Sequence, residues 1–331
     1  MATADQLKAL LKSYADGDED RFYAIAVQVA AHAAKQGHGK LAQEMRAIVD
    51  EAKTRVSGTN KRRMSPPVPV VQPRGDLASL LSALYPKTRL ADMVLDDELA
   101  RRLLRILQEQ RAQHKLSAYG LGARRKILLV GPPGTGKTMT AAALAGELNL
   151  PLFTVLLDGL ITKFMGETAA KLRLIFDAIH QTRGVYLFDE FDAIGSERAD
   201  PNDVGEIRRV LNSFLQFLEQ DQSDSLIVAA TNHPQLLDRA LFRRFDDVIQ
   251  YALPTDVQLR SVFLHRLNLF DTDEIEWPRV LTAAQGLSYG DLTRACEDVA
   301  KEAVLTDTHA ITTPAVERAL AERRAAQQAG S

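Results

Sequence analysis

The residues best suited to chemistry lie between Gly131 and Thr138, in the stretch Gly-Pro-Pro-Gly-Thr-Gly-Lys-Thr. They follow the apolar run 127–130, and a helix is expected to begin near Lys137. Glycines let backbone N–H groups crowd around a phosphate, and the start of a helix presents its positive dipole end to an anion. Lys137 would reach the β- and γ-phosphates, and Thr138 would supply a hydroxyl to Mg²⁺. The pattern predicts a phosphate-binding loop, and the alternative is an ordinary glycine-rich turn.

Polar residues end two apolar runs further along the chain. The run Val-Tyr-Leu-Phe at 185–188 is followed by Asp189 and Glu190, and Ala-Ala-Thr at 229–231 is followed by Asn232. We expect Asp189 to bind Mg²⁺ through water and Glu190 to polarise the attacking water. Asn232 would hold that water from the other side and sense the γ-phosphate. Alone, it would be only a strand-end cap.

The elements that must position these residues alternate between helix and strand. This order predicts a parallel α/β sheet with crossover helices, and ligands on such sheets lie beyond the carboxyl ends of the strands. The segment before it, 77–110, is expected to be mostly helical. The expected strands are 127–130, 152–157, 185–189, 226–231 and 248–251, and the expected helices are 136–148, 167–181 and 204–220.

Four parts of the chain follow from composition and periodicity. Residues 77–253 form the α/β domain, and 254–331 form a small helical lid domain with three or four amphipathic helices. Residues 1–56 predict a three-helix bundle that docks a substrate or partner. Its alternative is a helical pad packed on the main domain or on a neighbouring subunit. Residues 57–76, rich in proline and basic side chains, predict a flexible linker.

The amino-acid composition argues against several classes of protein. The chain has 331 residues, 46% of them hydrophobic and 25% charged, and a net charge of −2, so no global basic field favours nucleic acid as a partner. The single cysteine, Cys296, excludes an intramolecular disulfide, and we expect it to be a small residue in helix packing. No apolar run reaches the roughly 18 residues of a membrane span, and the N-terminus lacks a signal-peptide core. The expected location is cytoplasmic.

Taken together, these motifs resemble the AAA branch of the AAA+ ATPases. The most specific stretch is Leu-Asp-Arg-Ala-Leu-Phe-Arg-Arg-Phe-Asp at 237–246, and the resemblance covers about 77–328. It implies that Arg243 and Arg244 are arginine fingers that enter the nucleotide site of the next subunit, where their forked donors suit phosphoryl oxygens. A finger contributes about 10³ to 10⁵ in rate, so an isolated monomer should be nearly inactive.

The same resemblance assigns a pore loop to Lys163-Phe-Met-Gly166. In a ring, Phe164 and Met165 would project into the axial channel and grip an extended polypeptide, while Gly166 lets the loop turn. The alternative is a hydrophobic staple for the helix 167–181.

In the lid domain, Gly-Leu-Ser-Tyr-Gly-Asp-Leu at 286–292 resembles the family's turn that closes over the nucleotide. Tyr289 and Gly290 depart from the usual Gly-Ala order, although the backbone can still approach adenine or ribose. His265 lies where a nucleotide-contacting histidine often occurs, and its alternative role is structural. The set expected to contact the nucleotide is Gly131, Pro132, Pro133, Gly134, Thr135, Gly136, Lys137, Thr138, Met139, His265 and Gly290.

The resemblance implies a Mg²⁺-dependent ATPase that assembles as a homo-oligomeric ring, expected to be a hexamer, and threads a protein substrate through its pore. The short form of the arginine segment is similar to that of single-ring microtubule-severing and ESCRT-disassembly enzymes. A different hypothesis is an ATP-gated switch or loader that assembles on a partner such as DNA, without threading. A third is a compact bacterial AAA ATPase that works with a subtilisin-like partner protease.

Overall fold

The computed structural model describes residues 72–160, 165–192, 204–237 and 239–329, all within a unit formed by Val71–Ser331. The predicted N-terminal bundle 1–56 and residues 57–71 of the predicted linker 57–76 lie outside the described residues. None of the described helices is long and apolar enough to cross a membrane.

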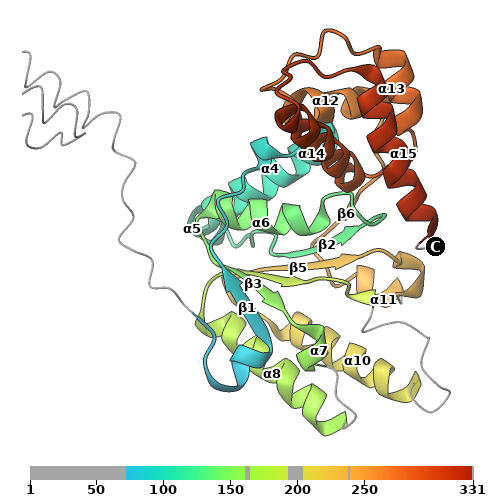
Figure 1. Ribbon diagram of the computed structural model, residues 1–331. Coiled ribbons are helices and arrows are strands. Elements are labelled where there is room, and N and C mark those ends of the chain that lie inside the picture. The colour runs from blue at the N-terminus through green and yellow to red at the C-terminus, as the bar shows by residue number, and fades with distance from the viewer. Residues whose placement is uncertain (1–71, 161–164, 193–203, 238, 330–331) are drawn as a thin grey trace, which may run out of the picture. The chain divides into compact units, whose positions relative to one another are not determined.

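A six-stranded sheet forms the centre of this unit, in the order β1-β3-β4-β5-β2-β6 (Figure 1). The strands β2 to β6 run parallel to one another, which confirms the predicted parallel α/β sheet. Their bounds are β2 Lys126–Val130, β3 Leu152–Val155, β4 Val185–Phe188, β5 Leu226–Thr231 and β6 Asp247–Gln250. The strands β2, β4 and β5 are buried along their whole length, because helices cover both of their faces.

Two helical layers cover the two faces of the sheet (Figure 1). On one face, α4 (Asp97–Arg111) and α6 (Lys137–Leu148) pack on Ile127, Leu129 and Val228. On the other face, α8 (Met165–Gln181) and α10 (Val204–Gln220) pack on the alternate strand residues. The remaining elements of this domain are short: η1 Gly75–Ser79, η2 Leu90–Asp92, α5 Gln113–Ser117, α7 Leu157–Leu160, η3 Pro234–Leu236 and α11 Arg239–Phe242.

One prediction about this domain holds only in part. We expected 77–110 to be mostly helical, and α4 occupies its second half, but its first half contains the strand β1 (Leu81–Leu84), which pairs antiparallel with β3. Leu80 and Leu81 are buried against the β3 side of the core, and the backbone amide of Leu156 donates to Leu80 O at 2.9 Å. Pairing with an existing sheet edge therefore decides the conformation here, rather than helical periodicity.

The described residues of the lid domain form four helices, within the predicted three or four. They are coloured orange to red in Figure 1. They are α12 Asp256–Arg266, α13 Trp277–Ala284, α14 Tyr289–Leu305 and α15 Thr313–Ala329. Their apolar faces enclose a separate core that includes Phe263, Leu292 and Cys296. Cys296 is buried on α14, where it packs between helices as expected.

Candidate active site

The phosphate loop connects the end of β2 to the start of α6. Gly134 and Gly136 adopt positive φ angles of 72° and 99°, which favour glycine. The Lys137 Nζ donates to the carbonyls of Gly131 and Pro132, both at 2.7 Å, so the lysine folds back along the loop. Burial lowers the pKa of Lys137, and the nearby carboxylate of Asp189 partly offsets that effect. The loop therefore has the backbone shape and the cation that a phosphate group requires.

The acidic turn after β4 lies beside the start of α6. The Thr138 hydroxyl donates to Asp189 Oδ2 at 2.6 Å, and the Glu190 amide donates to Asp189 Oδ1 at 3.0 Å. Glu190 has a φ of 50°, in the left-handed region that a non-glycine residue rarely adopts. A hydroxyl and a carboxylate in contact are oxygen donors of the kind Mg²⁺ binds, with phosphate and water completing its shell. Thr138 and Asp189 therefore fit a magnesium ion.

The end of β5 lies next to this turn, because β4 and β5 are neighbours in the sheet. Asn232 follows β5 directly, and its backbone N–H donates to Asp192 Oδ1 at 3.3 Å. Thr231, the last residue of β5, donates its hydroxyl to the same oxygen at 2.9 Å. The sheet thus brings together Asn232, Glu190 and Asp189, as their positions after parallel strands predict.

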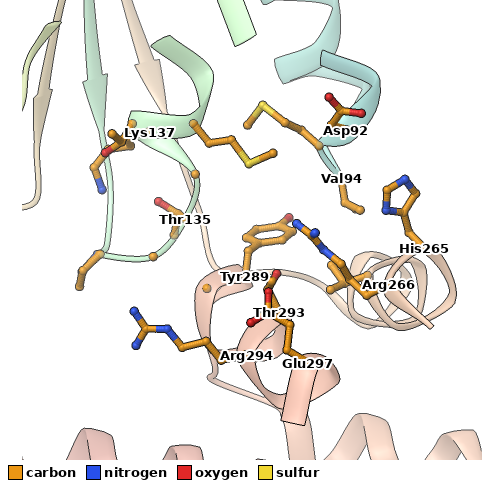
Figure 2. Close-up of a pocket in the computed structure, with 18 of the residues that line it drawn as sticks. Asp92, Val94, Thr135, Lys137, His265, Arg266, Tyr289, Thr293, Arg294 and Glu297 are labelled. Carbon is orange, nitrogen blue, oxygen red and sulfur yellow. The ribbon is translucent and has the colours of Figure 1, made fainter. Parts of the chain in front are cut away.

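These elements surround a cavity of about 580 Å³ between the α/β domain and the lid (Figure 2). Its volume suits a nucleotide-sized ligand. Twelve predicted residues line it: Pro133, Gly134, Thr135, Gly136, Lys137, Thr138, Met139, Asp189, Glu190, Asn232, His265 and Gly290. Gly131 and Pro132 belong to the loop but do not line the cavity, and their carbonyls bind Lys137 instead.

The lid is bonded to the phosphate loop directly. The Gly290 amide donates to Gly134 O at 2.9 Å. Ser288 caps α14 by accepting from the Asp291 amide at 3.2 Å, and its side chain lies against Gly134. Gly290 thus contacts the loop as well as the cavity, so the lid turn supports the loop beside the ligand.

Several lining residues have no spacing motif and were not predicted as binding residues. The segment 92–94 before α4 forms one wall, and Arg266, Thr293, Arg294 and Glu297 line the lid side. Figure 2 shows the Tyr289 ring inside the cavity, near Thr135. Burial, with a smaller effect from the charge of Asp96, raises the pKa of Tyr289 to about 12, so the phenol is neutral at physiological pH.

The remaining predicted residues lie elsewhere. Arg243 and Arg244 follow α11 and do not line the cavity. Arg244 Nε donates to Glu219 Oε1 at 2.6 Å, whereas Arg243 is exposed and has no hydrogen bond or ion pair with any described residue. Of the predicted pore loop, Lys163 and Phe164 lie outside the described residues. Met165 and Gly166 begin α8, and their side chains are not described.

The parallel sheet, the phosphate loop and the paired acids define a nucleotide-hydrolysing α/β enzyme with a helical lid. Residues 127–253 match the ATPase family associated with various cellular activities (AAA). The chain is 34% identical over 334 residues to the AAA family ATPase y4kL of Sinorhizobium fredii, covering 99% of this chain and 98% of that protein. The chain therefore belongs to the AAA family, and it is an ATPase.

Other relatives share only part of their length with this chain. A proteasome-activating nucleotidase of Methanoregula boonei is 33% identical over 58% of this chain and 46% of its own length. The ATP-dependent zinc metalloprotease FtsH 4 of Sphaerobacter thermophilus is 33% identical over 67% of this chain, which spans about a third (35%) of that protein. The crystal structure of the FIGL-1 AAA domain has the same fold, with a TM-score of 0.58 and 23% identity, over 73% of this chain and 85% of that one.

Proposed function

We propose that the chain hydrolyses ATP with Mg²⁺ at the interfaces of a ring, expected to be a hexamer, and uses the energy to remodel a protein substrate. The main support for this proposal is that only some of the predicted catalytic residues line the cavity of their own chain. Glu190 and Asn232 line the same cavity as the phosphate loop, whereas Arg243 and Arg244 do not.

The cavity residues divide the hydrolysis of ATP between them. Lys137 binds the β- and γ-phosphates, and Glu190 accepts a proton from the attacking water while Asn232 orients that water. Thr138 and Asp189 would hold Mg²⁺, which would offset part of the negative charge of the phosphates. This division accounts for the contact between Thr138 and Asp189 and for the position of Asn232 beside the acidic turn.

The two arginines are proposed to complete the site of a neighbouring subunit. Their position outside the cavity gives them no role in the site of their own chain. Arg243 is exposed and has no partner among the described residues, so its guanidinium can meet a phosphate across an interface. Arg244 is paired with Glu219, which holds it on α10 and suits a supporting role.

A polypeptide is the proposed substrate, gripped by Phe164 and Met165 and delivered by the N-terminal residues 1–56. Support comes from two partial relatives whose names refer to a proteasome and to ATP-dependent proteolysis. We therefore include a partner protease in the proposal. The proposed location is the cytoplasm.

Complementation between two inactive variants tests the shared site. Glu190→Gln should bind ATP without hydrolysing it, and Arg243→Ala should be nearly inactive. In a random equal mixture about one quarter of the interfaces combine an intact Glu190 with an intact Arg243, so about a quarter of wild-type turnover should return. No recovery would contradict action between subunits, and full turnover by Glu190→Gln alone would contradict its role as the base.

A second assay addresses the substrate. ATP hydrolysis is measured with unfolded protein and, separately, with DNA. Stimulation by unfolded protein that is lost in Phe164→Ala supports threading, while basal turnover should persist in that variant. Stimulation by DNA alone, indifferent to Phe164, would instead support a switch or loader.

A further inference from the structure

A buried hydroxyl, that of Thr231, joins three parts of the active site. Thr231 is 0% exposed, and its hydroxyl donates to Asp192 Oδ1 at 2.9 Å while accepting from the His233 amide at 3.0 Å. Its carbonyl accepts from the Gly131 amide at 3.3 Å. One residue therefore connects the phosphate loop, the acidic turn and the segment that carries Asn232.

Asp192 completes this connection from the β4 side. Its Oδ1 accepts from both the Thr231 hydroxyl and the backbone N–H of Asn232, the latter at 3.3 Å. The preceding residue, Phe191, donates its amide to Ala230 O at 2.9 Å. The acidic turn is thus bonded to the end of β5 at two consecutive residues, which fixes the backbone of Asn232 relative to the turn.

The backbone of the acidic turn needs such a restraint. Glu190 has a φ of 50°, and a non-glycine residue keeps a left-handed backbone only where its surroundings hold it. Phe191 is fully buried, with its ring centroid 4.6 Å from that of Phe214, so the turn is anchored directly after Glu190. The bonds from Phe191 and Asp192 hold the Glu190 backbone in this conformation.

We propose that Asp192 and Thr231 are positioning residues that set the separation between Glu190 and Asn232 across the ends of β4 and β5. The proposal rests on the roles of Glu190 and Asn232 given above. Neither Asp192 nor Thr231 lines the cavity, so both act through other residues. Their loss should slow hydrolysis while leaving the contacts with ATP in place.

The test compares Thr231→Val and Asp192→Ala with the conservative variants Thr231→Ser and Asp192→Asn, which keep the hydroxyl or the accepting oxygen. A matched control is Ser225→Ala at the opposite end of β5. Ser225 is also fully buried, and its hydroxyl donates to Ile179 O at 2.9 Å and accepts from the Gly184 amide at 3.3 Å. Measured quantities are kcat and KM for ATP, the Kd of a fluorescent ATP analogue and the thermal midpoint, at protein concentrations where turnover per chain has reached its plateau.

We expect kcat to fall about 10- to 100-fold in Thr231→Val and Asp192→Ala, as a displacement of catalytic groups by about 1 Å would cause. The Kd should stay within about threefold of wild type, and the conservative variants should restore kcat to within about threefold. The double variant Thr231→Val/Asp192→Ala should be no slower than the slower single variant, because both substitutions break the same connection. Ser225→Ala should lower the thermal midpoint without changing kcat.

Full kcat in Asp192→Ala would overturn the proposal, and so would a joint loss of kcat, affinity and thermal stability. Failure of Thr231→Ser to restore kcat would also count against it. If Thr231→Val does not fold, the kcat values of Asp192→Ala and Asp192→Asn test the proposal by themselves. The variant Glu190→Gln distinguishes failure of the proposed function from failure of the positioning proposal. Turnover in that variant contradicts the proposed base, whereas an inactive Glu190→Gln beside a fully active Asp192→Ala contradicts only the positioning.

Discussion

The contact between the lid and the phosphate loop can be broken by a single methyl group at Gly134. Gly134 has a φ of 72°, and a Cβ there would lie 2.9 Å from the Ser288 Cβ and closer still to its hydroxyl. Ser288 caps α14, and the Gly290 amide donates to Gly134 O at 2.9 Å. The variant Gly134→Ala must therefore strain its backbone and also push the lid turn away from the loop.

The loss of ATP affinity in Gly134→Ala can be estimated from the backbone strain, the helix cap and the hydrogen bond. A left-handed alanine costs about 1 to 2 kcal/mol. Displacing the lid turn disturbs the Ser288 cap, at about 1 kcal/mol, and breaks the hydrogen bond to Gly290, at about another 1 kcal/mol. The part due to the lid is thus about 2 kcal/mol, or about 30-fold in ATP affinity if the lid must rest on the loop to close the cavity.

Gly286 provides the matched control. Its φ is 81°, and an added Cβ meets nothing within 4 Å, so Gly286→Ala shares the backbone strain without the collision. The Kd of a fluorescent ATP analogue and the thermal midpoint are measured for both variants. Gly134→Ala should bind about 30-fold more weakly than Gly286→Ala, and Ser288→Gly in the Gly134→Ala background should recover part of that loss. Equal affinities in the two alanine variants would refute the idea that the lid rests on the loop.

Two further predictions concern stability. Burial raises the pKa of Cys296 to about 12, so its contribution to stability is complete below the unfolded thiol pKa of about 9 and is lost as the pH rises towards 12. Alkylation near pH 9 should therefore be blocked until urea unfolds the lid, and rapid native alkylation would contradict this. Arg102 on α4 binds Asp247 and donates to Val248 O at 2.7 Å, so Arg102→Ala should destabilise the fold by about 1 to 2 kcal/mol in urea unfolding. Arg105 on the same helix is largely exposed in its pair with Glu109, so Arg105→Ala should cost less than about 0.5 kcal/mol, and equal losses would contradict the argument.

The predicted residues that line the cavity share one physical property. Asp189 and Glu190 follow β4, Asn232 follows β5, and Lys137 begins α6 after the phosphate loop that leaves β2. Parallel strands end at the same edge of a sheet. Strand order was then sufficient to bring them together. Arg243 and Arg244 were also predicted from a motif, but their proposed partners belong to another chain, so their role stays a prediction.

The residues that the sequence missed depend on contacts between distant segments. Residues 92–94 precede α4, and Arg266 and Arg294 lie in the lid, so these segments meet at the cavity only through the tertiary fold, and no local spacing encodes that arrangement. The strand β1, Leu-Ser-Ala-Leu, has no β-branched residue and forms because the edge of β3 is free to pair with it.

The charges around the cavity are consistent with the proposal that a second chain contributes to the site. Three cations, Lys137, Arg266 and Arg294, line the cavity together with four carboxylates, Asp92, Asp189, Glu190 and Glu297. A triphosphate adds more negative charge to a site where carboxylates already outnumber the cations, and during hydrolysis negative charge shifts onto the leaving oxygen of the β-phosphate. Mg²⁺ would offset part of this charge, and the proposed arginine finger would offset more. Arg243 is exposed and lies outside the cavity of its own chain, so its guanidinium is accessible for that proposed role.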